Sequence, residues 1–166
     1  VVRWAQRNPK AIFHRRFNPT SQQGAYTKTH IRQYSDAAFK KEENSGHSMR
    51  GAVFVRCPGD TSAEMQCATK CHLIDFVGRG QRRVVRATFS AELQAGCDAQ
   101  YRGFLLTQIM HEIATGQTSA DRARQLRECG GYVVPMCLYL DALSVFAAIT
   151  ATFVKMPAEN GVLVHL

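Results

Sequence analysis

Three carboxylates of the sequence, Asp36, Glu92 and Asp141, stand where a folded chain could bring them together. Asp36 ends one predicted strand, Asp141 ends another, and Glu92 lies in a long predicted helix. If the two strands are neighbours, both aspartates meet at one position of the sheet, and the helix can bring Glu92 over them. Carboxylates held in this way are natural ligands for a pair of divalent cations, which together can activate a water and stabilise a leaving oxygen in phosphodiester hydrolysis.

Each of the three residues also has an ordinary structural explanation. Asp36 is typical of a residue that begins a turn after a strand, Glu92 of a solvated helix residue, and Asp141 of an N-cap for the helix that follows it. For each residue alone, the structural explanation is the favoured one. Only the combination indicates a metal site, because it depends on a shared geometry that the sequence does not display.

Arginines are concentrated directly before the helix that carries Glu92. Arg79, Arg82, Arg83 and Arg86 fall within eight residues of one another, in a predicted basic loop. Such a cluster indicates contacts with phosphates, and a solvated basic loop is the alternative. The whole chain has a net charge of +8, which favours a polyanionic partner, nucleic acid first and an anionic membrane second. Charge alone is equally compatible with a basic protein that has no such partner.

The first half of the chain has the pattern of three strands and a helix. Residues 30–37, 51–57 and 71–77 alternate in polarity or are rich in β-branched residues, and Gly78 closes the third segment. Their short connections predict an antiparallel meander. In the first strand we expect Ile31, Gln33 and Ser35 on one face and Arg32, Tyr34 and Asp36 on the other.

The strongest helical pattern runs from Thr88 to about Ile113. Glu92, Gly96, Ala99 and Gly103 form one stripe of small residues around a carboxylate. Glycine inside a helix costs up to about 1 kcal/mol relative to alanine. Two glycines on one stripe therefore predict that something, such as sheet backbone, approaches closely there; a helix that merely tolerates glycine is the alternative.

The second half predicts one more strand and one more helix. Residues 115–131 form a polar linker with a possible helical turn, which Gly130 and Gly131 stop. Residues 132–140 are almost continuously apolar, as is typical of a strand buried on both faces. Asp141 opens a helix over 142–154 that Pro157 ends, whereas residues 1–7 and 12–17 predict a short helix and a short strand near the start.

Composition limits the classes of protein to which the chain can belong. A length of 166 residues fits one domain, and 45% hydrophobic with 20% charged residues is the balance of a folded globular chain rather than a disordered one. No apolar run approaches the roughly 20 residues of a membrane helix, and the start lacks the pattern of a signal peptide. We therefore expect an intracellular protein that is not secreted and has no membrane partner.

The six cysteines suggest one alternative metal site. Cys67, Cys71 and His72 are close in sequence, and Cys57 is the nearest further thiol. A zinc site needs four converging ligands, and the paired C-x-x-C spacing of zinc ribbons is absent. Reduced, partly buried thiols are the ordinary interpretation.

Several segments resemble the ribonuclease H domain of copia-type retrotransposon polyproteins. The residues YSDA at 34–37 resemble the motif that opens this domain, and SMRGAVFV at 48–55 resembles its second-strand block. RATFSAELQA at 86–95 resembles the turn that leads into the helix with the catalytic glutamate. LDA at 140–142, with the following SVFAAI, resembles the fourth strand with its metal-binding aspartate. The opening VVRWAQRNPKAIF resembles the linker after the polymerase portion, so the resemblance covers nearly the whole chain in the family's order.

This resemblance implies a fold, a reaction and a role for each site residue. The fold is a ribonuclease H-like mixed sheet, with three antiparallel strands and then a parallel one, flanked by helices. The reaction is cleavage of the RNA strand of RNA–DNA hybrids with two Mg²⁺ or Mn²⁺ ions. Asp36 would bridge both ions, Glu92 would bind one and Asp141 the other. Arg79, Arg82, Arg83 and Arg86 would contact phosphates of the hybrid, and the rest of the polyprotein would be a partner.

The chain also departs from the family. Nothing after Asp141 matches the family's fourth carboxylate, its last strand and helix have no counterpart, and Asp75 has no family role. We therefore divide the chain into a connector at 1–29 and a ribonuclease H-like domain at 30–166 that is truncated at its C-terminal end. We expect this fragment to cleave weakly or not at all. The alternative is a decayed or domesticated retroelement remnant that binds nucleic acid without cutting it.

Overall fold

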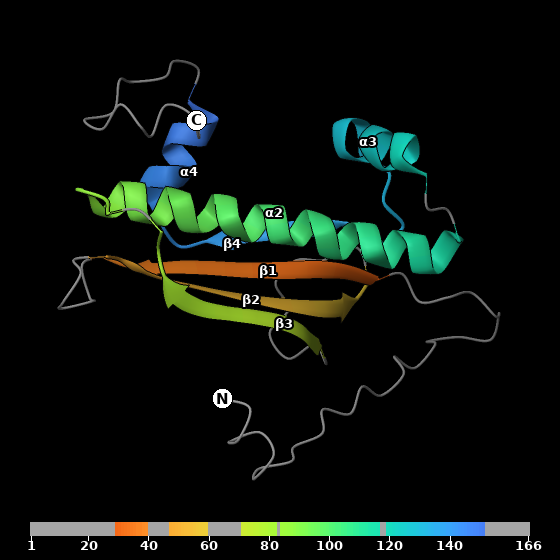
Figure 1. Ribbon diagram of the computed structural model, residues 1–166, viewed down its shortest axis with the longest axis horizontal. Coiled ribbons are helices and arrows are strands. Elements are labelled where there is room, and N and C mark those ends of the chain that lie inside the picture. Colours follow the sequence, from red (N-terminus) through yellow and green to blue (C-terminus); the bar gives the residue numbers. More distant parts are fainter. Residues whose placement is uncertain (1–28, 40–46, 60–70, 83, 117–118, 152–166) are drawn as a thin grey trace, which may run out of the picture.

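The computed structural model describes residues 29–39, 47–59, 71–82, 84–116 and 119–151. Its elements are, in chain order, β1 (Thr29–Ala38), β2 (Met49–Pro58), β3 (His72–Gly80), α2 (Thr88–Thr115), α3 (Ala120–Cys129), β4 (Met136–Leu140) and α4 (Leu143–Thr150). The strands form one sheet in the order β3-β2-β1-β4 (Figure 1). The β1–β2 and β2–β3 pairs are antiparallel and the β1–β4 pair is parallel. This is an α/β fold with ribonuclease H-like topology, as the sequence predicts.

β1 lies between β2 and β4 and presents two different faces. Ile31 is fully buried, and Gln33 Nε2 donates a hydrogen bond to Gln100 Oε1 of α2 at 2.6 Å. On the opposite face, the exposed ring of Tyr34 stacks on the ring of Tyr139 in β4, with centroids 5.1 Å apart. The predicted division of this strand into two faces is confirmed.

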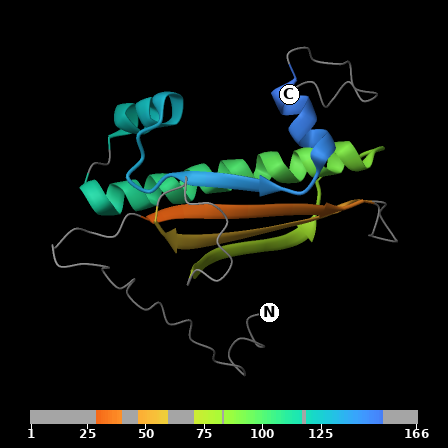
Figure 2. The same ribbon diagram turned by 180° about the vertical axis from the view of Figure 1, so that it is seen from behind.

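α2 lies along one face of the sheet, and α3 and α4 lie beyond it on the same side, near its two ends (Figures 1 and 2). Ala52 and Phe54 of β2 form a buried cluster with Ala99 of α2. Partly buried residues of three elements pack against this cluster, namely Val77, Leu106 and Leu138. None of the helices in the described ranges is long and apolar enough to cross a membrane.

A second apolar cluster joins the first turns of α2 to the segment around β4 and α4. Its buried members are Leu93 of α2 and Val145 of α4. Partly buried residues pack around them, namely Phe89, Cys97, Leu140 and Ala142. Asp141 lies between two of these residues in the chain, so the cluster fixes the backbone from which its carboxylate extends.

β4 is shorter and less buried than predicted for residues 132–140. The chain turns at Gly130 and Gly131, which have positive φ angles of 77° and 92°, and the strand begins only after Pro135. Proline has no N–H to donate to a strand ladder, and the Pro135 carbonyl instead accepts a hydrogen bond from Ile31 N at 2.8 Å. Every residue of β4 is half-buried, because within the described sheet this strand has one neighbour, β1.

β3 is longer than predicted. It continues through Gly78 to Gly80, because Gly78 pairs with Gly51 and Arg79 pairs with Arg50 in the ladder with β2. Arg79 is therefore a strand residue, and the basic connection to α2 is confined to residues 81–87.

The helices of the second half also differ from the predicted ones. α3 has ten residues where the sequence indicates a linker with a possible turn, and the Ser119 hydroxyl caps it by accepting a hydrogen bond from Arg122 N at 3.4 Å. The Gly130 that follows α3 confirms the predicted stop. α4 ends at Thr150, earlier than predicted, because Ala151 is extended.

Some predictions concern residues outside the described ranges. These are the short helix at 1–7, the strand at 12–17, the residues after 151, Cys67 and Arg83. Of the predicted connector, Thr29 alone lies within a described range, where it begins β1.

The close approach predicted at the two glycines of α2 is present. A Cβ atom at Gly96 would lie 3.3 Å from Leu140 Cδ2. At Gly103 it would lie 2.9 Å from Gln33 Cδ and 3.0 Å from Met136 Sδ. The atoms that approach the helix belong to side chains of β1 and β4, whereas the sequence suggested sheet backbone.

We predict that Gly103→Ala destabilises the protein although alanine favours helices. Gln33 is fully buried and held by Gln100, so it cannot move away from the new methyl group, and such overpacking costs about 1–3 kcal/mol. Chemical denaturation measures the change. Gly96→Ala is the matched control, because its methyl group meets only the end of the Leu140 side chain. A Gly103→Ala variant as stable as Gly96→Ala would contradict the packing described.

Candidate metal centre

Asp36, Glu92 and Asp141 come together in space. One carboxylate oxygen of each lies within 4.8 Å of those of the other two. Across the described ranges, no other set of three or more histidine, cysteine, aspartate or glutamate side chains converges in this way. The three residues form an acidic cluster that could hold a metal ion.

The parallel pairing of β1 with β4 brings the two aspartates together. Ser35 is the register partner of Leu140, so Asp36, the next residue of β1, lies beside Asp141, which directly follows the end of β4. Neighbouring strands are about 4.8 Å apart. Asp36 lies inside β1, opposite Gly51 of β2, and is therefore not a turn residue.

Asp141 does not cap the helix that follows it. The N-cap of α4 is Ala142, whose carbonyl accepts hydrogen bonds from Val145 N at 3.0 Å and Phe146 N at 3.2 Å. Asp141 precedes that position and is exposed. The capping explanation is therefore wrong, and the carboxylate remains available to a ligand.

Glu92 of α2 is buried beside these two aspartates. It lies near the start of α2 and only 7% of it is exposed. Its Oε2 atom has no hydrogen-bond partner among the described residues. Its pKa is raised to about 7, chiefly by burial and then by the charges of Asp36 and Asp141, while a hydrogen bond from the Ala37 backbone acts in the opposite direction. The explanation of Glu92 as a solvated helix residue is wrong.

The chemistry of this cluster suits a hard cation. A buried carboxylate oxygen without a partner is costly to desolvate, and two more carboxylates stand beside it with exposed side chains. Divalent cations such as Mg²⁺ and Mn²⁺ prefer oxygen ligands of this kind. A cation bound here would give Glu92 the partner that the protein itself does not provide.

The predicted arginine cluster is divided between two elements. Arg79 faces Arg50 across the β2–β3 ladder, whereas Arg82 and Arg86 are exposed in the connection that leads to α2. Arg83 lies outside the described ranges. Sequence analysis missed Arg50, because its place beside Arg79 depends on strand register rather than on spacing in the chain.

Of the candidate ligands of the alternative zinc site, two sulfur atoms lie close together, and no third ligand joins them within the described part of the chain. Cys57 Sγ and Cys71 Sγ lie 2.6 Å apart, where the end of β2 meets the start of β3. Neither His72 nor another candidate ligand joins them in a group of three. Cys67 lies outside the described ranges.

Comparisons with known proteins give no relative for this chain. No protein-family model matches it, and neither the curated proteins nor the solved structures contain a significant match. The ribonuclease H-like description therefore rests on strand order and direction. The resemblance to copia-type elements remains a prediction from the motifs.

We predict that Glu92→Gln stabilises the metal-free protein at pH 8 and not at pH 4. The ordinary pKa of 4.5 is raised to about 7 in the folded state, so the unfolded chain loses its proton first as the pH rises. Below about pH 4.5 the neutral carboxyl of Glu92 makes its full contribution to the free energy of unfolding. This contribution is lost as the pH rises to about 7, and the loss amounts to up to roughly 3 kcal/mol. Glutamine has no charge to bury and avoids this cost.

Thermal unfolding at both pH values, with a chelator present, measures this effect. Glu128→Gln is the matched control, because Glu128 is exposed on α3. A Glu92→Gln variant that follows the wild-type stability at both pH values would show that the carboxyl is not buried as a charge.

Proposed function

We propose that this chain is a divalent-metal-dependent nuclease that cleaves the RNA strand of RNA–DNA hybrids as part of a retrotransposon polyprotein. The observation that carries the proposal is the convergence of Asp36, Glu92 and Asp141 at one end of a ribonuclease H-like sheet. Other nuclease substrates share the same phosphodiester chemistry. The choice of a hybrid and of a retroelement rests on the motif resemblance described above.

The roles of the three carboxylates follow from their exposure and their elements. Asp36 and Asp141 are exposed and would hold the ions on the solvent side, where a phosphate can reach them. Glu92 would complete the site from the helix with its unpartnered oxygen. Two bound Mg²⁺ or Mn²⁺ ions supply a nucleophilic water at neutral pH and neutralise charge on the leaving oxygen.

Charge supports a polyanionic substrate. The net charge of +8 attracts nucleic acid, and Arg82 and Arg86 are exposed close in sequence to the helix of Glu92. Contacts of this kind position a backbone without reading its sequence. We therefore expect hybrid binding that weakens steeply with salt.

Binding without cleavage is the second candidate function. The observation that favours it is that three carboxylates, not four, converge in the described part of the chain. Fewer oxygen ligands hold two ions less firmly, because Mg²⁺ takes six ligands in near-octahedral geometry. This candidate predicts salt-sensitive hybrid binding that falls when Arg82 and Arg83 lose their charge and that does not depend on metal.

We predict weak cleavage of an RNA–DNA hybrid by the 166-residue chain in Mg²⁺ or Mn²⁺, which Asp36→Asn reduces to the level seen with a chelator. The amide removes one anionic ligand from the site and keeps the shape of the side chain. The measurement is the release of labelled RNA fragments. Asp121→Asn, an exposed carboxylate in the first turn of α3, is the matched control and should keep full activity.

The outcomes separate the two candidates. Cleavage that survives Asp36→Asn would refute the assignment of the site. Hybrid binding with no cleavage in either metal would favour the second candidate. Strong cleavage that Asp36→Asn abolishes would support the nuclease and refute the expectation of weak activity.

A further inference from the structure

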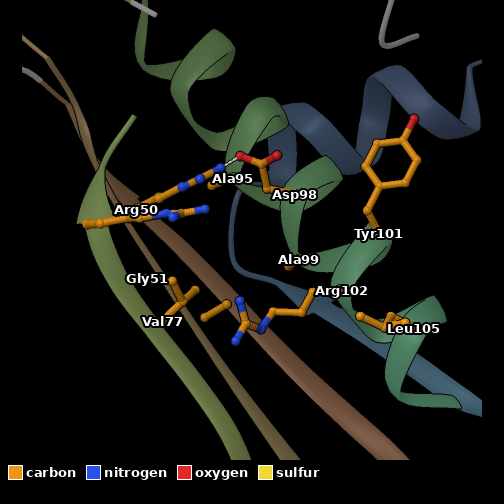
Figure 3. A pocket seen from close by; sticks show the side chains of 11 residues that line it. Arg50, Gly51, Val77, Ala95, Asp98, Ala99, Tyr101, Arg102 and Leu105 are labelled. Atoms are coloured by element: carbon orange, nitrogen blue, oxygen red, sulfur yellow. Dashed lines mark ion pairs between the residues drawn. The ribbon is translucent and has the colours of Figure 1, made fainter. Parts of the chain in front are cut away.

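The β2–β3 ladder has different chemistry at its two ends. At one end, Arg50 reaches from β2 toward α2 beside a cleft of about 290 Å³ (Figure 3). At the other end, Arg56 and His72 form the last register pair. The next residues outward are Cys57, still in β2, and Cys71, which directly precedes β3. The two cysteines therefore face each other across neighbouring strands.

This placement meets the geometry that a disulfide requires of the backbone. Directly opposed residues of an antiparallel pair have Cα atoms about 4.5–5.5 Å apart, and disulfides join Cα atoms about 4.4–6.8 Å apart. The Sγ atoms of Cys57 and Cys71 lie 2.6 Å apart, and both residues are present as thiols. A bond between the two sulfur atoms therefore requires no rearrangement of either strand.

The surroundings of Cys57 hold this end of β2 in place. His30 is the register partner of Cys57, and both residues are fully buried. Arg32 Nε donates a hydrogen bond to His30 Nε2 at 2.9 Å, so Nδ1 of that ring carries the hydrogen and donates it to the Gly59 carbonyl at 3.0 Å. The ring thereby anchors the backbone two residues beyond Cys57, and the thiol keeps a fixed position opposite Cys71.

The two thiols differ in their access to solvent. Cys71 is exposed, whereas Cys57 is fully buried. Burial raises the pKa of the Cys57 thiol and the adjacent Cys71 raises it further, while the charge of Arg32 acts in the opposite direction. The thiolate is the nucleophile in exchange reactions. Cys71 is therefore the thiol that a dissolved disulfide meets first, and Cys57 is the thiol that resolves the mixed disulfide.

We propose that Cys57 and Cys71 form a site of reversible thiol–disulfide exchange with a small disulfide such as oxidised glutathione. Cys71 loses its thiol proton and attacks one sulfur of the small disulfide, and the first glutathione thiolate leaves and takes up a proton. Cys57 Sγ then attacks Cys71 Sγ, and the second glutathione thiolate leaves and takes the proton of Cys57. Two electrons pass from the cysteines to the small disulfide, which becomes two reduced glutathione molecules. In a reducing compartment the thiols persist, and the bridge forms when the proportion of oxidised glutathione rises.

Peptide mapping locates the bridge. The Cys67→Ser variant is used, because trypsin then leaves Cys57 in the peptide 57–70 and Cys71 in the peptide 71–79, with no other cysteine in either. The reduced chain is incubated with reduced and oxidised glutathione, its remaining thiols are alkylated, and the unreduced peptides are identified by mass spectrometry. We expect the two peptides to be joined, in a fraction that rises with the proportion of oxidised glutathione and disappears with dithiothreitol. Separate peptides at every proportion would overturn the proposal.

Thermal unfolding tests whether the bridge forms in the folded protein. Closing a loop of about 15 residues should raise the melting temperature of the oxidised wild type by roughly 6–12 °C over that of the reduced protein. Cys71→Ser, at an exposed position, should remove this shift, whereas Cys129→Ser, which removes an exposed thiol of α3, should keep it. A shift that survives Cys71→Ser, or none in the wild type, would refute the assignment. Neither measurement uses a metal or a nucleic acid, so both results are independent of the proposed nuclease.

Discussion

The parallel pairing of β1 with β4 is the constraint on which the acidic cluster depends. The register of Ser35 with Leu140 places Asp36 and Asp141 side by side, although 104 residues separate them in the chain. A parallel pair requires a crossover connection, usually a helix that covers the sheet. Here the chain between the two strands includes α2, which packs on β1 and β4 and carries Glu92. One pairing therefore brings all three carboxylates to the same end of the sheet.

Apolar packing of residues that adjoin Glu92 and Asp141 in the chain offsets the cost of burying Glu92. That cost is up to roughly 3 kcal/mol at neutral pH, from the rise of its pKa to about 7. Leu93 and Val145 are buried next to it, and each contributes about 1.5–3 kcal/mol by leaving water. Gly96 lets the helix lie against Leu140 at that depth. The fold can therefore tolerate the buried charge of Glu92 in the absence of a metal, because neighbouring apolar residues stabilise the backbone that carries it.

The sequence predicted what depends on local periodicity and missed what depends on register. Alternation located β1, and helical spacing located α2 to within two residues of its end, because one buried face determines each pattern. The apolar run at 132–140 indicated β4 but not where it begins. The strand starts only at Met136, after Pro135 and after the turn at two glycines with positive φ. The position of Arg50 beside Arg79 could not be predicted, because its register partners Ala37 and Arg79 lie on other strands. The three carboxylates were found through motif order, and their convergence became visible only with the β1–β4 pair in place.

The alternation of side chains along the strands also explains how acidic and basic groups coexist without neutralising each other. Asp36 shares its row across the sheet with Gly51 and Gly78, which have no side chains to place a charge beside it. The next row, on the face toward α2, holds Arg50 and Arg79. A one-residue slip of β2 would turn an arginine to the face of Asp36 and allow an ion pair there. Because the register prevents this, the carboxylate of Asp36 has no arginine in its own row of the sheet.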